Sequence, residues 1–436
     1  MLLWEENYLN INQFLNVVCT QIRYRPARNE IANELKAHLL EIKDELLTQG
    51  IEESIAEENA VQRMGEAEEI GKQLNKIHRP RINWILIIVT AIFIFLGVVN
   101  LINKQIITHN GYIGKIFKYI ILGIGAGVIV YLLDYKKIKK YSWHIYIIAT
   151  LVMLLTFMGV GYKINERIYI RIFSIYFSSS EIAVPLYLIS FAGYMTDINS
   201  KKALNQVLKI LLLEVMPLIL LKIGCSIEGI AILSIAYFIY GCEIILHTED
   251  KVKRKYTVFC LILLIGILSF SKSIMVDTNN ISVEDKKMAI IKNDIMKNSK
   301  FVGETETSCF KENELFICGQ SNYTFLYIIG KMGILFGMIL IILIVVIIAT
   351  IIYILRNIKD VYGKYLVIGA GVSLIFELTT NVIMNVSDNV IFKVNFPLLT
   401  DGLIYFVINC ICIAIILAVY RRKDIYMYNN CEYQNK

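Results

Sequence analysis

The sequence predicts an all-α membrane protein, in which about ten transmembrane helices follow a small soluble helical domain. Hydrophobic residues make up 56% of the 436 positions, and the mean hydropathy is +0.57. A soluble chain of this length could not bury so much apolar surface. The apolar residues also gather in blocks of about 17 residues or more, the length with which a helix crosses roughly 30 Å of hydrocarbon. The charged residues, 19% of the chain, stand between these blocks.

The apolar blocks set the expected order of the membrane part, which runs from residue 82 to residue 423. The expected spans cover residues 82–102, 115–133, 143–161, 180–196, 207–223, 226–246, 256–272, 323–355, 365–384 and 402–420. The eighth block is longer than one span requires and carries Lys331 near its start. We therefore expect this block to begin as a tilted or amphipathic stretch on the outer side of the membrane.

Basic residues gather in every second loop between the expected spans. They occur around residues 136–140, 201–202, 251–255, 356–364 and 421–423. Because loops rich in Lys and Arg stay on the cytoplasmic side, we expect a multi-pass plasma-membrane protein with both termini, including the tail 424–436, in the cytoplasm. The loops 161–179, about 273–322 and 385–400 then face outwards. The net charge of +7 comes mostly from the basic loops and gives no indication of nucleic-acid binding.

The outer loop at about 273–322 is too long for a simple connection, which indicates a functional role. It holds Cys309 and Cys318, the pair of cysteines expected on an oxidising face. These two either form a disulfide or remain free thiols in a mobile loop. The pair Cys410-x-Cys412 has no neighbouring Cys or His to complete a zinc site. We therefore expect no metal ion and no cofactor.

Residues 1–80 are polar and show the period of amphipathic helices. The apolar stripe of one helix consists of Ile31, Leu35, Leu39, Ile42 and Leu46. Ser54-Ile55-Ala56-Glu57 has the pattern of a capping box, and Gly65 follows as a C-terminal cap. The runs Glu34-Leu35-x-x-His38-Leu39 and Ala60-x-x-x-Met64-Gly65 are similar to the HAAS-type helical domain found ahead of membrane proteins in Gram-positive bacteria. That resemblance implies a regulatory module that binds a cytoplasmic partner.

Three stretches of the membrane part carry a second resemblance. Arg167-Ile168-Tyr169-Ile170-Arg171, followed in register by Ser180-Glu181-Ile182-Ala183-Val184, resembles an Arg-Trp-Ile-Arg run that continues to Ser-Glu-x-x-Lys. Phe376-Glu377-Leu378-Thr379-Thr380-Asn381-Val382 is similar to Phe-Gln-x-x-x-Asn-Ile. Phe396-Pro397-Leu398-Leu399-Thr400-Asp401-Gly402 is similar to Leu-Pro-Phe-Ile-Ser-Tyr-Gly. The runs that these stretches resemble are those of the SEDS family (shape, elongation, division and sporulation proteins such as FtsW, RodA and SpoVE). Their order, the ten expected spans and the Tyr420-Arg421-Arg422 ending extend the resemblance over nearly all of residues 82–423.

The resemblance implies a role in peptidoglycan synthesis, in cell shape, division or sporulation. SEDS proteins are glycosyltransferases that polymerise lipid II on the outer face of the membrane, usually beside a class B penicillin-binding protein. The expected substrate-binding residues are Arg171, Glu181, Asn381 and Lys331, and the expected structural residues are Pro397 and Gly402. Arginine is well suited to the pyrophosphate of lipid II, and a carboxylate on an outer loop serves as the general base for the attacking sugar hydroxyl.

The sequence departs from the family at the position of that carboxylate. The family has an Asp where the long outer loop enters the eighth span, and this chain has Asn322. An amide cannot accept the proton, although another loop carboxylate such as Glu314 could replace it. Val184 stands where the family has Lys, and Cys225-Ser226-Ile227-Glu228-Gly229 stands near a missing Pro-Asp-x-Gly-Thr run. We therefore expect weak polymerase activity or none, with a binding cavity around Arg171 and Glu181.

Two other classes of function remain open. One is a non-catalytic membrane sensor or scaffold, with the N-terminal domain as its output. The other is a lipid flippase or transporter, for which an inverted repeat is expected, and the sequence shows no convincing internal similarity. Glu214 and Glu243 lie in expected spans, where a carboxylate is either functional or paired near the membrane surface.

Overall fold

The computed structural model describes residues 10–77, 79–108, 112–156, 161–164, 167–172, 175–196, 203–247, 283–387, 393–399 and 402–423. The chain forms two compact units. One is Met1–Ile82 together with Arg421–Lys436, and the other is Asn83–Tyr420. The expected seventh span, 256–272, and the expected tail, 424–436, lie outside the described residues.

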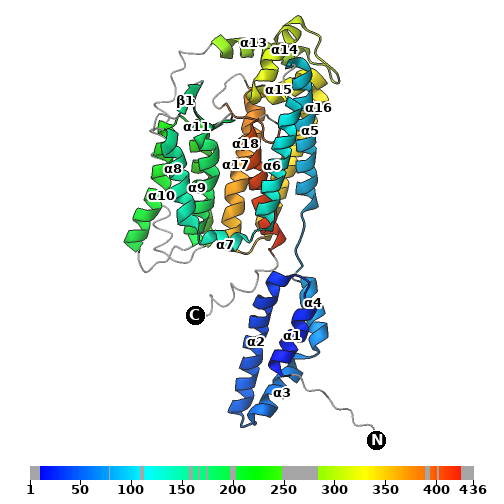
Figure 1. Cartoon of the computed structure of the whole chain (residues 1–436), viewed down its shortest axis with the longest axis vertical. Helices are drawn as coiled ribbons and strands as arrows, with labels where there is room; N and C mark the ends of the chain where they lie inside the picture. The colour runs from blue at the N-terminus through cyan, green and yellow to red at the C-terminus, as the bar shows by residue number, and fades with distance from the viewer. Residues whose placement is uncertain are drawn as a thin grey trace. The chain divides into compact units, whose positions relative to one another are not determined.

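The first unit is a small helical bundle made of α1 (Ile11–Gln21), α2 (Arg25–Thr48), α3 (Glu53–Met64) and α4 (Ala67–Ile77) (Figure 1). Its core includes Phe14 and Val18 of α1 and Leu39 of α2, which are at most 1% exposed. The predicted stripe on α2 is confirmed, because Ile31, Leu39 and Leu46 are buried, while Leu35 and Ile42 are half-buried.

The caps of this bundle agree with the sequence in part. Gly65 ends α3 with φ +93°, in the left-handed region that favours glycine. The predicted capping box at Ser54 is wrong, because α3 already begins at Glu53 and the residue before it, Glu52, makes no side-chain cap. A capping box lies instead at the start of α1, where the side chains of Asn10 and Gln13 each accept a hydrogen bond from the other's backbone N–H.

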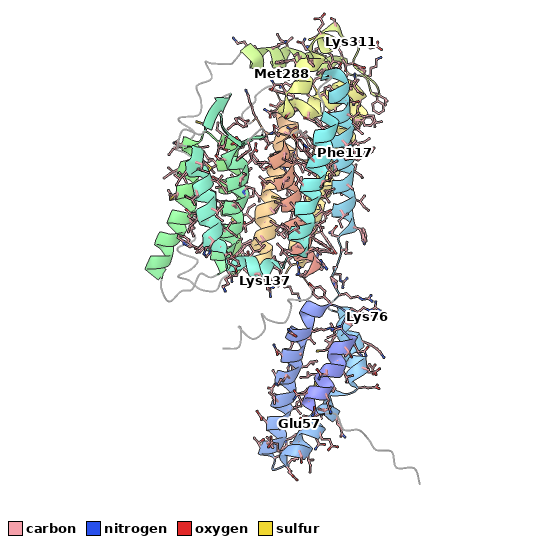
Figure 2. All side chains as sticks on the ribbon, viewed as in Figure 1. Glu57, Lys76, Phe117, Lys137, Met288 and Lys311 are labelled. Carbon is pink, nitrogen blue, oxygen red and sulfur yellow. The ribbon has the colours of Figure 1, made fainter. Side chains whose placement is uncertain are left out.

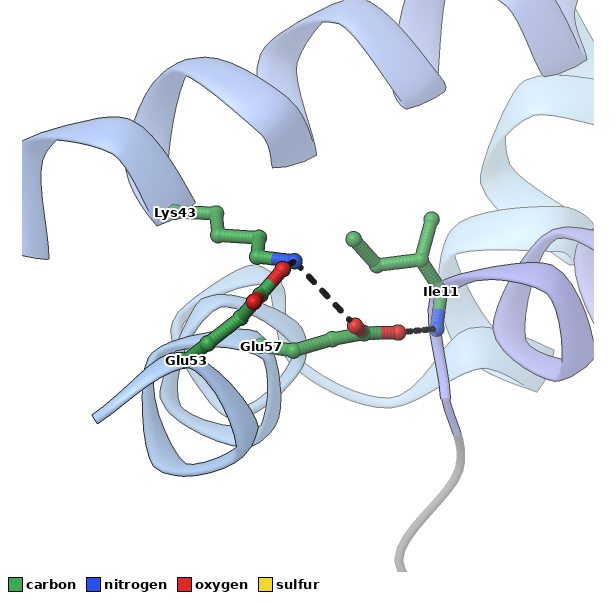
Figure 3. Close-up of polar contacts among 4 residues, drawn as sticks. All are labelled: Ile11, Lys43, Glu53 and Glu57. Carbon is green, nitrogen blue, oxygen red and sulfur yellow. Dashed lines mark hydrogen bonds and ion pairs between the residues drawn. The ribbon is translucent and has the colours of Figure 1, made fainter. Parts of the chain in front are cut away.

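A charged cluster joins three helices of the bundle (Figure 3). Glu57 of α3 accepts a hydrogen bond from the backbone N–H of Ile11 at 3.1 Å and lies 3.5 Å from Lys43 Nζ of α2. Lys43 also donates to Glu53 at 2.8 Å. Glu57 thereby satisfies an N–H at the start of α1 that has no partner within the helix, and it fixes α1 against α2 and α3.

The cluster predicts how the stability of the first unit depends on pH. A hydrogen bond from Lys43 lowers the pKa of Glu53 below its usual 4.5, so its stabilising contribution is present above that pH and is lost as the pH falls through the lowered pKa. We expect the urea midpoint of a fragment of residues 1–82 to fall on acidification below pH 4.5, and to fall less in Lys43→Met. Equal acid sensitivity of the two proteins would contradict the assignment, and absence of cooperative unfolding would contradict the predicted independent domain.

The second unit is a helical bundle capped at one end by the described part of the long loop that the sequence predicts to face outwards, and 'outer' is used below for this end. Its described helices are α5 (Trp84–Thr108), α6 (Tyr112–Leu132), α7 (Tyr135–Lys139), α8 (Ser142–Leu155), α9 (Ser179–Thr196), α10 (Ala203–Ile223), α11 (Ile227–His247), α13 (Val283–Asn298), α14 (Ser308–Gly319), η3 (Ser321–Tyr323), α15 (Thr324–Met332), α16 (Ile334–Asn357), α17 (Val361–Val386) and α18 (Leu403–Arg421). Among the described residues, α5, α11, α16, α17 and α18 contain stretches long and apolar enough to cross a membrane. The predicted all-α polytopic fold is confirmed.

The ends of this unit agree with the alternation of basic and long loops. Met288 and Lys311, on α13 and α14, lie at the end of the helices opposite Lys137 of α7 (Figure 2). The expected outer loop and the expected cytoplasmic loop at 136–140 are therefore on opposite sides of the bundle. That the Lys137 side faces the cytoplasm stays a prediction from the charges of the loops.

The outer segment 161–179 contains a small sheet where the sequence indicates only a loop. The strands β1 (Gly161–Ile164), β2 (Arg167–Ile172) and β3 (Ile175–Ser178) pair antiparallel in the order β1-β2-β3. The alternation of isoleucine with polar or aromatic residues along β2 is typical of strands. It is too short to distinguish from a loop without the strands that pair on both sides.

The eighth apolar block is interrupted at Gly333. This residue separates α15 from α16 with φ +102°, and a Cβ there would lie 2.7 Å from the carbonyl oxygen of Phe301. The segment before α14 pairs with the break, since the backbone N–H of Thr305 donates to Gly330 and that of Ile334 donates to Lys300. The block therefore begins as a helix of its own, α15, where the sequence predicts a tilted or amphipathic stretch. It is not an amphipathic surface stretch, however, because residues 324–330 are all buried.

A disulfide between Cys309 and Cys318 is incompatible with the structure. Both residues lie in α14, and Cys309 is a free thiol. Nine residues along an α-helix correspond to about 13.5 Å, roughly twice the Cα separation that a disulfide spans. The sequence indicated a loop at this point, and the helix that forms there instead holds the two cysteines apart.

The free thiol gives a test of the topology. A membrane-impermeant maleimide should label Cys309 in intact cells without prior reduction and should leave Cys19 unlabelled until the cells are lysed. Burial first, and then Asp294 and Glu312, raise the pKa of Cys309 above its usual 9.0, so labelling should be slow and should accelerate with rising pH. Labelling of Cys19 in unlysed cells would contradict the cytoplasmic placement of the N-terminus.

Candidate ligand-binding cleft

A cleft of about 440 Å³, including its open mouth, lies among α9, α11, α17 and α18. It is lined by Ser180, Glu181, Val184, Pro185, Ser226, Glu228, Gly229, Ile232, Ser373, Glu377, Val394, Asn395 and Tyr405. Carboxylates and hydroxyls thus make up much of the wall. Glu181, the residue expected in the cavity, lines this cleft, and so does Val184 at the position of the family's Lys.

The starts of two helices place polar groups at the cleft. Glu181 lies in the first turn of α9 and Glu228 in the first turn of α11, where the positive end of the helix dipole stabilises a carboxylate. Gly229 follows directly, and a Cβ there would lie 2.8 Å from Ser226 Oγ and 3.1 Å from Val184. The missing side chain at Gly229 therefore allows the start of α11 to approach α9 closely.

Glu377 of α17 is a third carboxylate of the cleft, and no role was expected for it. Its Oε2 lies 2.7 Å from the hydroxyl of Tyr405 on α18, and Ser373 Oγ lies 3.4 Å from Oε1. The available signal was a charged residue in the middle of an apolar span, which by itself suggests function. The motif that this run resembles has a Gln of similar shape at that position, so the charge of Glu377 was given no role.

Two buried asparagines of α17 hold the backbone of Asn322 in place. The Nδ2 of Asn381 donates to the carbonyl of Asn322 at 2.9 Å and to the carbonyl of Val394 at 2.6 Å. The Nδ2 of Asn385 donates to the same Asn322 carbonyl at 3.1 Å. Asn381 and Asn385 are both 0% exposed. Both amide hydrogens of Asn381 are used on backbone carbonyls, so this group positions the outer segments and has no hydrogen left for a ligand.

The same contacts place Asn322 beside the cleft. Val394 lines the cleft, and the amide of Asn381 bridges its carbonyl to that of Asn322. Glu377 lies four residues before Asn381 on α17, which is about one turn or 6 Å along the helix. The structure therefore brings together Asn322, Asn381, Glu181 and Glu377, of which the last was not expected.

Lys331 lies away from this cleft. It forms ion pairs with Glu314 at 2.8 Å and Glu304 at 3.0 Å, which tie α15 to the outer loop. It lines a separate hollow of about 390 Å³ that contains Asn100 of α5. The expected substrate-binding role of Lys331 gains no support from this position. Glu314, the carboxylate that could substitute for the missing Asp, is engaged in the same ion pair.

The remaining expected residues are described only in part. Arg171 lies in β2, where its backbone pairs with Tyr176, and its side chain is outside the described part of the structure. Pro397 lies in a turn of the segment 393–399, next to Leu398, whose φ is +64°. The carbonyl of Gly402 accepts the backbone N–H of Phe406 at 2.9 Å, which starts α18. Pro397 thus lies in a turn and Gly402 at the start of a helix, and their structural roles stay a prediction.

The two carboxylates expected within spans lie outside the lining of the cleft. Glu243 of α11 forms an ion pair with Lys364 of α17 at 2.6 Å, a structural contact between two helices. Glu214 of α10 is 7% exposed, next to Leu213, whose carbonyl accepts a hydrogen bond from Tyr237. Within the described residues, no three His, Cys, Asp or Glu side chains are grouped so that they could hold a metal ion.

The fold is similar to solved structures of RodA. A crystal structure of the rod shape determining protein RodA of Thermus thermophilus has a TM-score of 0.52 and 14% identity, covering 78% of this chain and 97% of that chain. A mutant of the same protein has a TM-score of 0.55 and 14% identity, covering 78% and 98%. A chain from a peptidoglycan synthase complex, described for its coordination of polymerization and crosslinking, has a TM-score of 0.57 and 16% identity, covering 79% and 99%. No protein-family model and no curated protein sequence matches the chain.

Proposed function

We propose that this protein, which has the polytopic fold of RodA, acts in peptidoglycan synthesis and binds lipid II in the cleft among α9, α11, α17 and α18. The observation that supports this proposal is the cleft itself, whose wall includes Glu181. Asn381 also links the backbone carbonyl of Asn322 to that of the lining residue Val394. Carboxylates and hydroxyls are suitable partners for the hydroxyl and amide groups of an amino-sugar precursor. The expected pyrophosphate ligand is Arg171, on the strand β2, which pairs with the strand β3 that runs into α9.

Asn322 favours binding over catalysis. Polymerisation requires a base to take the proton from the sugar hydroxyl that attacks the anomeric carbon as the pyrophosphate leaves. The amide of Asn322 cannot take that proton, and Glu314 is occupied by Lys331. We therefore propose that the protein polymerises lipid II weakly or not at all. A non-catalytic sensor or scaffold is the second candidate function, and Asn322 is the observation that favours it.

Two partners complete the proposal. A neighbour of similar fold belongs to a peptidoglycan synthase complex, which supports a class B penicillin-binding protein as the partner of the membrane part. The first unit, in the cytoplasm by the charge pattern, binds a separate cytoplasmic partner. Its resemblance to HAAS-type domains and its well-packed helical core support that role.

Lipid II binding by the purified full-length protein tests the function. We expect saturable binding of fluorescent lipid II, weakened in Glu181→Gln because that change removes a charged hydrogen-bond acceptor for the hydroxyl and amide groups of the sugar. The control is Glu306→Gln, an exposed carboxylate of the outer loop that pairs with Lys300 and should leave binding unchanged. Absence of lipid II binding, or equal weakening by both variants, would contradict the proposed site.

A further inference from the structure

The hydroxyl of Tyr405 lies between two oxygen atoms at the edge of the cleft. One is Oε2 of Glu377 at 2.7 Å, and the other is the backbone carbonyl oxygen of Asn395 at 2.9 Å. Both distances are those of good O–H···O hydrogen bonds. The hydroxyl has a single hydrogen, so it can donate to only one of the two oxygens.

The count of hydrogens determines the state of Glu377 that fits this geometry. A backbone carbonyl only accepts hydrogen bonds, and an ionised carboxylate also only accepts. Both contacts are satisfied when Glu377 carries a proton and donates it to Tyr405 Oη, while Tyr405 donates to the carbonyl of Asn395. Glu377 still accepts hydrogen bonds from Ser373 Oγ at 3.4 Å and from the side-chain amide of Asn409 on α18. With Glu377 ionised, two acceptors would compete for one hydrogen.

The groups that face Glu377 from the neighbouring helices agree with a neutral acid. α9 contributes Glu181 to the same cleft and α11 contributes Glu228. α18 contributes Tyr405 and, nearby, the buried thiol of Cys412. The described lining residues of the cleft include no Lys, Arg or His. An ionised Glu377 would be repelled by two other carboxylates, and binding a proton removes this repulsion.

We propose that Glu377 is a proton-binding site, and that its proton fastens the segment 393–399 to α18 through Tyr405 and Asn395. When the proton leaves, the charged carboxylate takes the Tyr405 hydrogen in a stronger, charge-assisted bond. The carbonyl of Asn395 then loses its donor. Val394 stays attached, because Asn381 still holds its carbonyl, so the release begins at Asn395. This inference goes beyond the proposed function and does not depend on the identity of the ligand in the cleft.

Infrared spectroscopy of the full-length protein in nanodiscs tests the protonation directly. At neutral pH the wild type should show a protonated-carboxyl C=O stretching band that is lost in Glu377→Gln and shifted in Tyr405→Phe, where its hydrogen-bond partner is gone. The control is Glu243→Gln, because Glu243 is ion-paired with Lys364 and should not contribute to this band. A spectrum that is unchanged by Glu377→Gln would overturn the proposal.

Hydrogen–deuterium exchange of the segment 393–399 tests whether the proton on Glu377 holds this segment to α18. After correction for the intrinsic effect of pH on exchange, the wild-type segment should lose protection as the pH rises. Glu377→Gln should stay protected at every pH, because the Gln amide can donate to Tyr405 in the same arrangement. Tyr405→Phe should show at every pH the lowered protection that the wild type reaches only at high pH. Protection that does not change with pH in the wild type would refute the fastening, whether or not the protein binds or polymerises lipid II.

Discussion

Asn322→Asp should raise the rate of lipid II polymerisation by roughly 10²–10⁴-fold, the usual contribution of a well-placed general base. Asp has the shape of Asn and replaces its amide nitrogen by an oxygen, so the backbone contacts from Asn381 and Asn385 to the Asn322 carbonyl should persist. The backbone of residue 322 should therefore keep its place near Val394 of the cleft, and the new carboxylate can accept the proton that the amide cannot. The measurement is glycan-strand formation from lipid II by the purified full-length protein.

Two controls separate this effect from a general change in charge. Asn322→Ala should give no gain, because it removes the amide without supplying a base. Asn313→Asp adds the same charge to α14 of the outer loop, where the Nδ2 of Asn313 donates to the carbonyl of Cys309 one turn earlier in the helix, and should leave the rate unchanged. Strong polymerisation by the unmodified protein that survives Asn322→Ala would show that the base lies elsewhere.

Asn381→Ala should clearly destabilise the membrane part. It leaves the carbonyls of Asn322 and Val394 without their Asn381 donor, and each unsatisfied buried polar group costs about 1–3 kcal/mol. The carbonyl of Asn322 keeps its bond from Asn385, so the full cost falls on Val394. We expect a lower melting temperature of the full-length protein and weaker binding of lipid II, since Asn322 and Val394 both lie at the cleft.

The matched control is Asn357→Ala at the end of α16. Asn357 is only half-buried, and its Nδ2 bonds the carbonyl of Tyr353 in its own helix, so its loss should change the melting temperature little. If Asn381→Ala and Asn357→Ala melted alike, the two buried hydrogen bonds of Asn381 would not be structural.

The architecture was largely predictable because it depends on patterns that extend over many residues. Blocks of apolar residues predicted the long apolar helices described in the second unit, and the alternation of basic loops agrees with the two ends of that unit. The stripe Ile31–Leu46 likewise predicted α2. The motif around Glu181 indicated a residue that lines the cleft, and the role of Glu181 in binding stays a prediction.

The details that were missed depend on contacts between distant residues. The break at Gly333 requires the backbone of Phe301 next to it, and no local pattern shows that neighbour. The helix α14 separates Cys309 from Cys318, whereas the sequence suggested a loop that could bring them together. Lys331 resembled a ligand for an anion, but Glu304 and Glu314 lie close in space and bind it. The hydrogen-bonded arrangement of Glu377 could not be predicted, because Tyr405 and Asn395 lie further along the chain and meet it only in the folded structure.

The interruption at Gly333 also determines how the eighth block fits the thickness of the bilayer. A continuous helix over residues 324–357 would measure about 50 Å, far more than the roughly 30 Å of hydrocarbon. α16 alone has 24 residues and measures about 36 Å, which needs only a moderate tilt to match. The apolar residues of α15 are therefore covered by protein and not by lipid. A substitution in α15 should disturb the packing of the outer loop and should leave the fit of α16 to the bilayer unchanged.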